Sequence, residues 1–201
     1  MSFNLDLFAP EFEIDQPCLV NGLDYKREFI TPEEEHRLIK FIDENEWSND
    51  LKRRVQHYGY KYNYKIRKID ESLRATPIPN ELDFILERLV SNEIFDTKPD
   101  QLIINEYLPG QGITKHTDCI PCFKDTIVMI SLNSTCTMKF TKKDMETVEL
   151  FLEPRSILVC SGESRYEWAH EIPARKSDKY NGNVFHRSRR VSLTFRQVLL
   201  N

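Results

Sequence analysis

The half of the chain that follows Pro99 consists of short β-rich runs with no helical pattern between them. Turn residues such as Pro109-Gly110 and Glu153-Pro154-Arg155 separate the runs. Short strands that follow one another without helices are typical of sandwiches and jelly rolls. The predicted strands are residues 102–107, 126–132, 135–141, 147–152, 156–160 and 191–199.

The preceding half predicts two helices. Thr31 can cap the first turn of a helix, Pro32 suits the first helical position, and Glu34 completes a capping box. Apolar residues at helical spacing then continue to about Glu46, and a second apolar stripe predicts a helix over residues 80–91.

The chain shows no internal repeat and no linker-like tract. Its 201 residues suit one domain, and 40% hydrophobic with 30% charged residues allow a real core. We therefore expect a single domain over 1–201, with helices and a substrate lid in 1–100 and a jelly-roll core in 101–199. Residues 1–28 are expected to be irregular.

No run approaches the roughly 18 apolar residues that a spanning helix needs, so no membrane segment is expected. The first residues lack the basic and apolar regions of a secretory signal. Both observations predict a cytoplasmic or other intracellular protein.

The chain has five cysteines, and an odd number in a chain of this length predicts reduced thiols. Cys119 and Cys122 form a C-x-x-C motif, but no second pair stands at zinc-finger spacing. We expect two loop thiols there, with a redox-active pair or half of a zinc site as less favoured alternatives.

The net charge of −4 conceals two basic stretches. Residues 51–69 carry seven bases and no acid, and residues 170–201 carry seven bases against two acids. Such segregation indicates a basic face for a polyanion, because phosphate contacts supply most non-specific affinity for nucleic acids. Two solvated basic strand edges or loops explain the pattern equally well.

Tyrosines alternate with bases and amides from Arg54 to Tyr64. Interleaved arginine, lysine and tyrosine side chains can stack on bases while they pair with phosphates. An amphipathic strand whose tyrosines pack on the core is at least as good an explanation for any single residue.

His116 and Asp118 stand two apart, and His170 follows another apolar strand. An H-x-D pair occurs often by chance, but a second histidine on a separate strand completes a facial triad. Two imidazoles and one carboxylate hold Fe(II) on one face and leave other positions open. The remaining histidines lack such partners and are expected to be structural or exposed: His36, His57 and His186.

Residues 190–196 form a strict period-2 strand that places Arg190, Ser192, Thr194 and Arg196 on one face. Two inward-facing guanidiniums are costly unless they meet anions, and arginine suits bidentate binding of carboxylates. A dicarboxylate that also bridges to the metal would satisfy both. The alternative is a basic edge strand that faces water.

Two further polar side chains alternate on an earlier strand. Asn105 and Tyr107 precede the H-x-D turn and can add an amide and a phenol to the same site.

Together these motifs resemble the AlkB-type Fe(II)- and 2-oxoglutarate-dependent dioxygenases over residues 101–199, about half of the chain. The resemblance includes the segment Asn105–Gly110. The segments 161–166 and 53–60 are most similar to the subgroup that hydroxylates a modified wobble uridine in tRNA.

The resemblance implies a mainly β (α+β) fold, a double-stranded β-helix or jelly roll with N-terminal helices and a nucleotide-recognition lid. It further implies that His116, Asp118 and His170 bind the iron. Arg190 and Tyr107 are expected to contact the distal carboxylate of 2-oxoglutarate, and Arg196 and Asn105 its keto-acid end. Ser192 and Thr194 are expected to line the pocket. DNA-repair members carry Asn where this chain has Ser192, which weakens a transfer of alkyl-DNA repair.

The expected enzyme uses Fe(II), 2-oxoglutarate and O₂, releases succinate and CO₂, and hydroxylates a substrate C–H bond or removes an N-methyl group. We expect nucleic acid as the substrate, with RNA or tRNA favoured over DNA, and Arg54 and Tyr58 as substrate contacts. The alternatives are the same chemistry on a protein side chain or a metabolite, and a non-catalytic jelly-roll module that binds nucleic acid.

Overall fold

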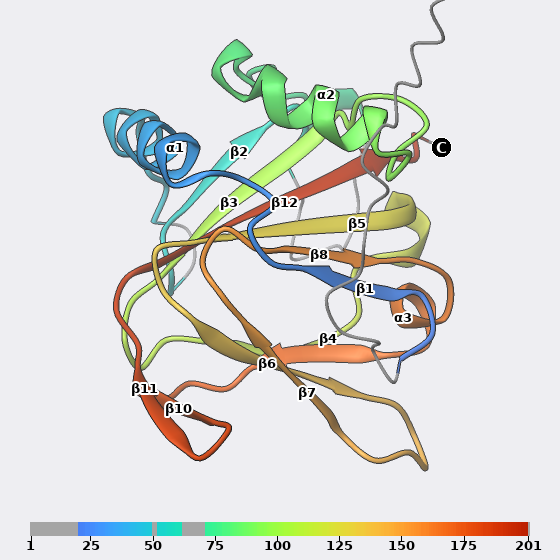
Figure 1. Cartoon of the computed structure of the whole chain (residues 1–201). Coiled ribbons are helices and arrows are strands. Elements are labelled where there is room, and N and C mark those ends of the chain that lie inside the picture. Colours follow the sequence, from blue (N-terminus) through green and yellow to red (C-terminus); the bar gives the residue numbers. More distant parts are fainter. Residues whose placement is uncertain (1–19, 50–51, 62–70, 201) are drawn as a thin grey trace, which may run out of the picture.

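Two antiparallel sheets face each other, and two helices cover the outer side of the larger sheet (Figure 1). The computed structural model describes residues 20–49, 52–61 and 71–200. The larger sheet has the strand order β1 (Leu23–Lys26), β8 (Ile157–Cys160), β5 (Phe123–Leu132), β12 (Arg190–Val198), β3 (Gln101–Tyr107) and β2 (Val55–Tyr58). The smaller sheet has the order β4 (Ile113–His116), β9 (Ala169–Ile172), β6 (Cys136–Thr141) and β7 (Val148–Leu152). The predicted jelly-roll architecture is confirmed.

Helix α1 (Pro32–Glu44) begins where its capping residues predict. The Thr31 hydroxyl accepts from the Glu34 backbone N–H at 3.2 Å, and the Glu34 carboxylate accepts from the Thr31 N–H at 2.9 Å. The second predicted helix is shorter than expected: a 3₁₀ turn over Asn80–Leu82 precedes α2 (Asp83–Ser91).

The apolar side chains form one core on each side of the larger sheet. The first core joins the helices to the sheet and includes Leu38 of α1, Ile85 of α2 and Leu193 of β12. The second lies between the two sheets and includes Phe140 and Trp168. Strand β12 is buried along its whole length because both of its faces are covered.

Several short elements carry no periodic signal, and the sequence analysis missed them. Strand β1 lies in a segment that was expected to be irregular, and its four residues pair only with β8. A four-residue strand contains at most two repeats of a period-2 pattern, which is too few to recognise in the sequence. The other missed elements are β4, β9, the hairpin of β10 (Ser177–Tyr180) and β11 (Asn183–His186), helix α3 (Gly162–Tyr166) and the 3₁₀ turns Glu71–Leu73 and Ile120–Cys122.

The expectation of reduced loop thiols is wrong for Cys119 and Cys122, which form a disulfide. The 3₁₀ turn over Ile120–Cys122 brings their Cα atoms to 5.3 Å, within the range that a disulfide spans. Cys136 and Cys160 are buried and form no disulfide with a described residue. The pair lies directly after Asp118, so the bond closes a tight loop beside one of the candidate iron ligands.

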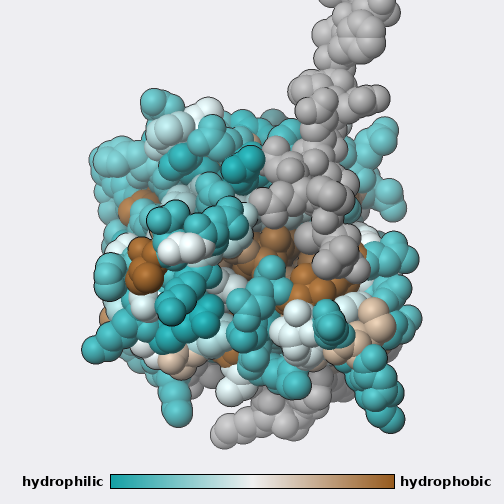
Figure 2. Space-filling model, turned by 60° about the horizontal axis from the view of Figure 1, so that its bottom comes forward, coloured by the Kyte–Doolittle hydropathy of each residue, from teal (hydrophilic) through white to brown (hydrophobic). Residues whose placement is uncertain are grey.

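Within the described ranges, no helix is long and apolar enough to cross a membrane. The face that Figure 2 turns forward is mostly hydrophilic, with hydrophobic surface gathered near its centre. Some large apolar side chains are exposed singly, such as Met145 and Val184. Isolated exposed apolar side chains are ordinary on folded proteins.

Candidate active site

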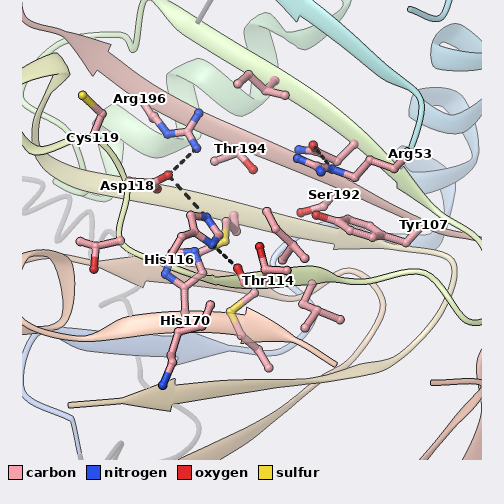
Figure 3. A pocket seen from close by; sticks show the side chains of 18 of the residues that line it. Arg53, Tyr107, Thr114, His116, Asp118, Cys119, His170, Ser192, Thr194 and Arg196 are labelled. Atoms are coloured by element: carbon pink, nitrogen blue, oxygen red, sulfur yellow. Dashed lines mark hydrogen bonds and ion pairs between the residues drawn. The ribbon is translucent and has the colours of Figure 1, made fainter. Parts of the chain in front are cut away.

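A cavity of about 580 Å³ opens between the two sheets (Figure 3). Side chains of β3 and β12 form one wall, and side chains of β4 and β9 form the opposite wall. Every residue predicted to bind iron or 2-oxoglutarate lines this cavity, with the exception of Arg190.

The three candidate iron ligands meet at one end of the cavity. His116 ends β4, Asp118 lies in the loop that follows, and His170 lies on β9. His116 and His170 are register partners whose ring centroids lie 4.4 Å apart, and Nε2 of His116 lies 4.0 Å from Oδ1 of Asp118. The topology therefore gathers two imidazoles and a carboxylate from separate segments.

This group is more open than a metal-bound triad. Two ligand atoms bound at about 2.1 Å in neighbouring positions of a metal lie about 3 Å apart. The separation of 4.0 Å between His116 and Asp118 is wider, and in the part of the chain that the structure describes no three metal-ligating side chains close around one point. Two imidazoles and one carboxylate nevertheless are a donor set that fits Fe(II).

The protonation states of these residues also suit a metal. Burial raises the pKa of Asp118, but Arg196, His170 and His116 outweigh it and bring that pKa to about 2. Burial lowers the pKa of His170 to about 4. The carboxylate is thus ionised and His170 is neutral at pH 7, which are the forms that bind metal ions.

The tautomer of His116 is set by the backbone. Its Nδ1 lies 2.8 Å from the carbonyl oxygen of Thr114. A carbonyl only accepts, so Nδ1 carries the proton and Nε2 presents its lone pair.

Two arginines hold the loop that carries Asp118. Arg196 pairs with its carboxylate at 3.1 Å. Arg165 of α3 donates to the backbone carbonyls of Asp118 and Cys119 at 3.0 and 3.1 Å. The sequence analysis assigned no role to Arg165, although it lies in the family-like segment 161–166.

Beside Tyr107, which lines the cavity, lies a buried cation without a full set of partners. Nη2 of Arg190 donates to the Ser131 hydroxyl at 2.7 Å, whereas its Nε and Nη1 have no hydrogen-bond partner among the described residues. The guanidinium lies 5.6 Å from the ring centroid of Tyr107. Unpaired buried N–H groups of a cation are costly, so this end is suited to an anionic ligand.

The register between β3 and β12 places the remaining candidates side by side. Arg190 pairs with Tyr107, and Ser192 pairs with Asn105. As predicted, Ser192, Thr194 and Arg196 face the cavity, while the residues between them face the helices.

The structure does not bring the two predicted substrate contacts to the cavity. Tyr58 is only 7% exposed and packs in the core beneath the helices. Arg54 stacks on Trp47 and pairs with Glu106 on the outer side of β3. Its neighbour Arg53 lines the cavity instead.

The arginines of the second basic stretch do not form an open basic face. Arg175 and Arg187 pair with the fully buried carboxylate of Asp178, and Arg189 pairs with Asp43 and Glu106. In the first stretch, Lys65, Arg67 and Lys68 lie outside the described residues.

The model of the 2OG-Fe(II) oxygenase superfamily matches residues 22–196. The chain belongs to this superfamily. Its members are Fe(II)- and 2-oxoglutarate-dependent dioxygenases, so the predicted enzyme class and the AlkB-like resemblance are confirmed.

The sequence similarity between this oxygenase and its relatives extends over nearly the whole chain. An uncharacterized protein of Acanthamoeba polyphaga mimivirus, L905, is 35% identical over 95% of this chain and 91% of its own length. The alkylated DNA repair protein ALKBH8 homolog of Arabidopsis thaliana is 37% identical over 94% of this chain, which spans 62% of that protein. The Xenopus tropicalis tRNA (carboxymethyluridine(34)-5-O)-methyltransferase alkbh8 is 37% identical over 92% of this chain, which spans 33% of it.

A solved structure, that of OsALKBH1, has the same fold. It superposes with a TM-score of 0.68 over 90% of this chain and 99% of its own, at 18% identity.

Proposed function

We propose that this oxygenase holds Fe(II) through His116, Asp118 and His170 and oxidises a modified or alkylated base in nucleic acid, with RNA favoured over DNA. The observation that carries the proposal is the buried Arg190 guanidinium, whose Nε and Nη1 have no partner among the described residues and which lies 5.6 Å from the ring of Tyr107, a residue of the cavity wall. A dicarboxylate co-substrate of the length of 2-oxoglutarate supplies the missing anion there and reaches the metal.

When bound, iron and 2-oxoglutarate supply the oxidative chemistry, in which O₂ is consumed, succinate and CO₂ are released, and a substrate C–H bond gains a hydroxyl group. On an N-methyl group the same hydroxylation leads to loss of formaldehyde. The chain itself supplies geometry and charge.

Each polar residue of the cavity has a proposed task. Arg190 and Tyr107 bind the distal carboxylate of 2-oxoglutarate, and Arg196 and Asn105 face its keto-acid end. The hydroxyls of Ser192 and Thr194 line the wall between the two ends.

A nucleic-acid substrate is supported by what the relatives are named for. The frog relative is named for a tRNA carboxymethyluridine, and the plant relative is named for repair of alkylated DNA. The Ser192 departure from DNA-repair members favours RNA. We further propose that residues 1–201 act as one catalytic domain, with 1–100 contributing the substrate side and 101–199 the catalytic core.

The test is incubation with Fe(II), ascorbate, 2-oxoglutarate and either total tRNA or genomic DNA, followed by mass spectrometry of the nucleosides and measurement of succinate. Loss of one modified nucleoside with an equal amount of succinate is expected from tRNA. Asp118→Ala should abolish both signals. Nucleic-acid binding should weaken steeply with salt, because each phosphate contact releases counterions.

Other outcomes would change the assignment. Succinate formed only with protein substrates would move the substrate class to protein side chains. No succinate with any substrate, together with retained nucleic-acid binding, would identify a non-catalytic binding module.

A further inference from the structure

Arg53 reaches the cavity from a different part of the chain than its other wall residues. In the described ranges, every other residue that lines the cavity lies at position 103 or beyond. Arg53 lies two positions before Val55, the first residue of β2, and Val55 pairs with Asn105 of β3. Figure 3 shows Arg53 beside Tyr107, at the end of the cavity away from Arg196 and Asp118.

The contact of Arg53 fixes the orientation of an amide. Its Nε donates to Oδ1 of Asn105 at 2.9 Å. A guanidinium has donors and no acceptor, so only the carbonyl oxygen of the amide can face it. The Nδ2 group of Asn105 must therefore point away from Arg53, and it makes no hydrogen bond to any described residue. Asn105 lines the cavity, so this donor is left for a ligand.

Arg53 also adds a second cation at this end of the cavity. Its guanidinium and that of Arg190 each lie 5.6 Å from the ring centroid of Tyr107. The Nε of Arg53 is engaged by Asn105, and the oriented amide is the group that suits a carboxylate ligand.

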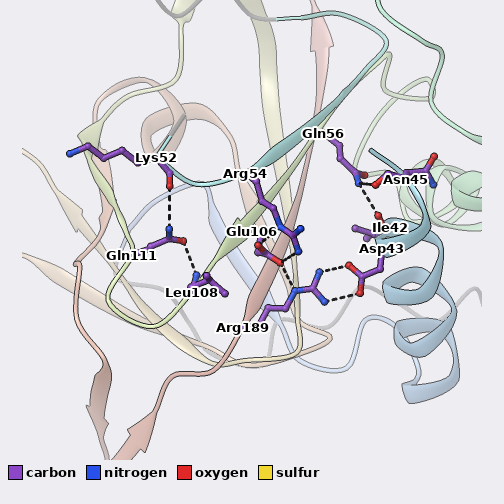
Figure 4. Close-up of polar contacts among 10 residues, drawn as sticks. All are labelled: Ile42, Asp43, Asn45, Lys52, Arg54, Gln56, Glu106, Leu108, Gln111 and Arg189. Atoms are coloured by element: carbon purple, nitrogen blue, oxygen red, sulfur yellow. Dashed lines mark hydrogen bonds and ion pairs between the residues drawn. The ribbon is translucent and has the colours of Figure 1, made fainter. Parts of the chain in front are cut away.

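The neighbouring residue anchors the segment on the opposite face of β3 (Figure 4). Nη2 of Arg54 donates to Oε1 of Glu106 at 2.8 Å, and the Glu106 N–H donates to the Arg54 carbonyl at 3.1 Å. Glu106 also accepts from Arg189, which pairs with Asp43 of α1. Arg53 and Arg54 thus bind consecutive residues of β3, one on each face of the strand. The contacts of Arg54 fix the backbone from which Arg53 extends.

From this arrangement we infer that Arg53 is a positioning residue for the co-substrate: it holds Asn105 with its amide N–H groups turned toward bound 2-oxoglutarate. The inference rests on the proposed function, because it assumes that 2-oxoglutarate occupies the cavity beside Asn105. Arg53 acts through Asn105 and belongs to the segment before β2.

The experiment is a double-mutant cycle on 2-oxoglutarate binding, measured by calorimetry with Mn²⁺ in place of Fe²⁺ so that no turnover occurs. Arg53→Ala should weaken binding about tenfold, the effect of one lost charge-assisted hydrogen bond. Asn105→Ala should weaken it by a similar factor. The double variant should bind no worse than Asn105→Ala alone, because Arg53 acts only through that amide.

Two further variants separate positioning from folding and from charge. Arg53→Lys keeps a donor for Oδ1 of Asn105 and should recover most of the lost affinity. Lys52→Ala removes a charge from the same segment and should leave the dissociation constant unchanged, since only its backbone carbonyl is engaged, by Gln111.

Two results would overturn the inference and leave the proposed function intact. In the first, the dissociation constant of Arg53→Ala for 2-oxoglutarate lies within twofold of that of the unsubstituted chain. In the second, the loss of affinity in the double variant equals the product of the two single losses. An unsubstituted chain that binds Mn²⁺ but no 2-oxoglutarate would overturn the proposed function together with the inference.

Discussion

The guanidinium of Arg196 and the carboxylate of Asp118 form an ion pair at 3.1 Å inside the cavity, although 78 positions separate them in the sequence. Arg190 stands on the same face of the same strand, at the end where Tyr107 lies. We therefore propose that the two arginines contact opposite ends of one bound co-substrate.

Because their positions differ, substitutions of Arg190 and Arg196 should have different effects on the kinetics. Arg190→Lys loses the planar fork for the distal carboxylate and should raise the half-saturating concentration of 2-oxoglutarate about tenfold or more, with turnover restored at high concentration. Arg196→Ala should lower turnover even at saturation, because Asp118 loses its partner. Saturation curves with iron content checked would measure this, and identical curves for both variants would contradict the assigned ends.

The buried carboxylate of Asp178 should be a major source of stability. Removing one partner of a buried ion pair costs about 3–5 kcal/mol, so Asp178→Asn should lower the free energy of unfolding by that amount at pH 7. The half-exposed pair of Lys139 and Glu149 offers a control, and Glu149→Gln should cost under about 1 kcal/mol. Urea unfolding would compare them, and equal costs for the two variants would refute the expectation.

This contribution should also depend on pH. Burial raises the pKa of Asp178, but hydrogen bonds from Arg187 and Arg175 outweigh it, so the pKa is lowered in the folded state. The stability that the ionised Asp178 carboxylate contributes is therefore fully present at pH values above 3.8, its ordinary pKa. It is lost as the pH falls through the lower pKa of the folded state. The difference in the free energy of unfolding between Asp178→Asn and the unsubstituted chain should narrow as the pH falls below 3.8, and a difference that grows in acid would contradict the expected sign.

Gly112 should not tolerate a side chain. A Cβ there would lie 2.1 Å from the carbonyl oxygen of Ile172 on β9. Gly112→Ala should therefore push β4 away from β9 and destabilise the chain by about 1–3 kcal/mol. Gly182 has positive φ but no atom within 4 Å of a built Cβ, so Gly182→Ala measures backbone strain without a clash. Thermal unfolding of both variants checks the difference, and a Gly112→Ala variant as stable as the parent would reject the clash.

The disulfide of Cys119 and Cys122 predicts a simple chemical result. Alkylation of the denatured chain should add two more groups when a reductant is used first than when it is not. Intact-mass spectrometry would count them. The same number of groups under both conditions would show two free thiols.

Features with a strong periodic or local signal could be predicted from the sequence. The face of β12 that lines the cavity follows from strict alternation, and the start of α1 follows from its capping box. The metal-ligand candidates were recognisable because His116 and Asp118 are close in sequence and His170 follows a clear strand.

Features that depend on long-range pairing could not be predicted. Arg53 and Arg54 are neighbours in a turn without periodicity, so nothing in the sequence tells which one faces the cavity. Likewise, Arg189 is paired with an acid 83 positions earlier, and only the fold shows that this charge is neutralised.

Strand β12 lies between β5 and β3 in the centre of the larger sheet, although it is the last of the described strands along the chain. During synthesis on the ribosome, β3 and β5 emerge first and cannot complete their sheet until residues 190–198 arrive between them. Arg190 and Arg196 arrive with that strand. A nascent chain therefore holds His116, Asp118 and His170 before it holds the two arginines that we propose to bind opposite ends of the co-substrate, so the proposed site is completed only after residue 196 has been added.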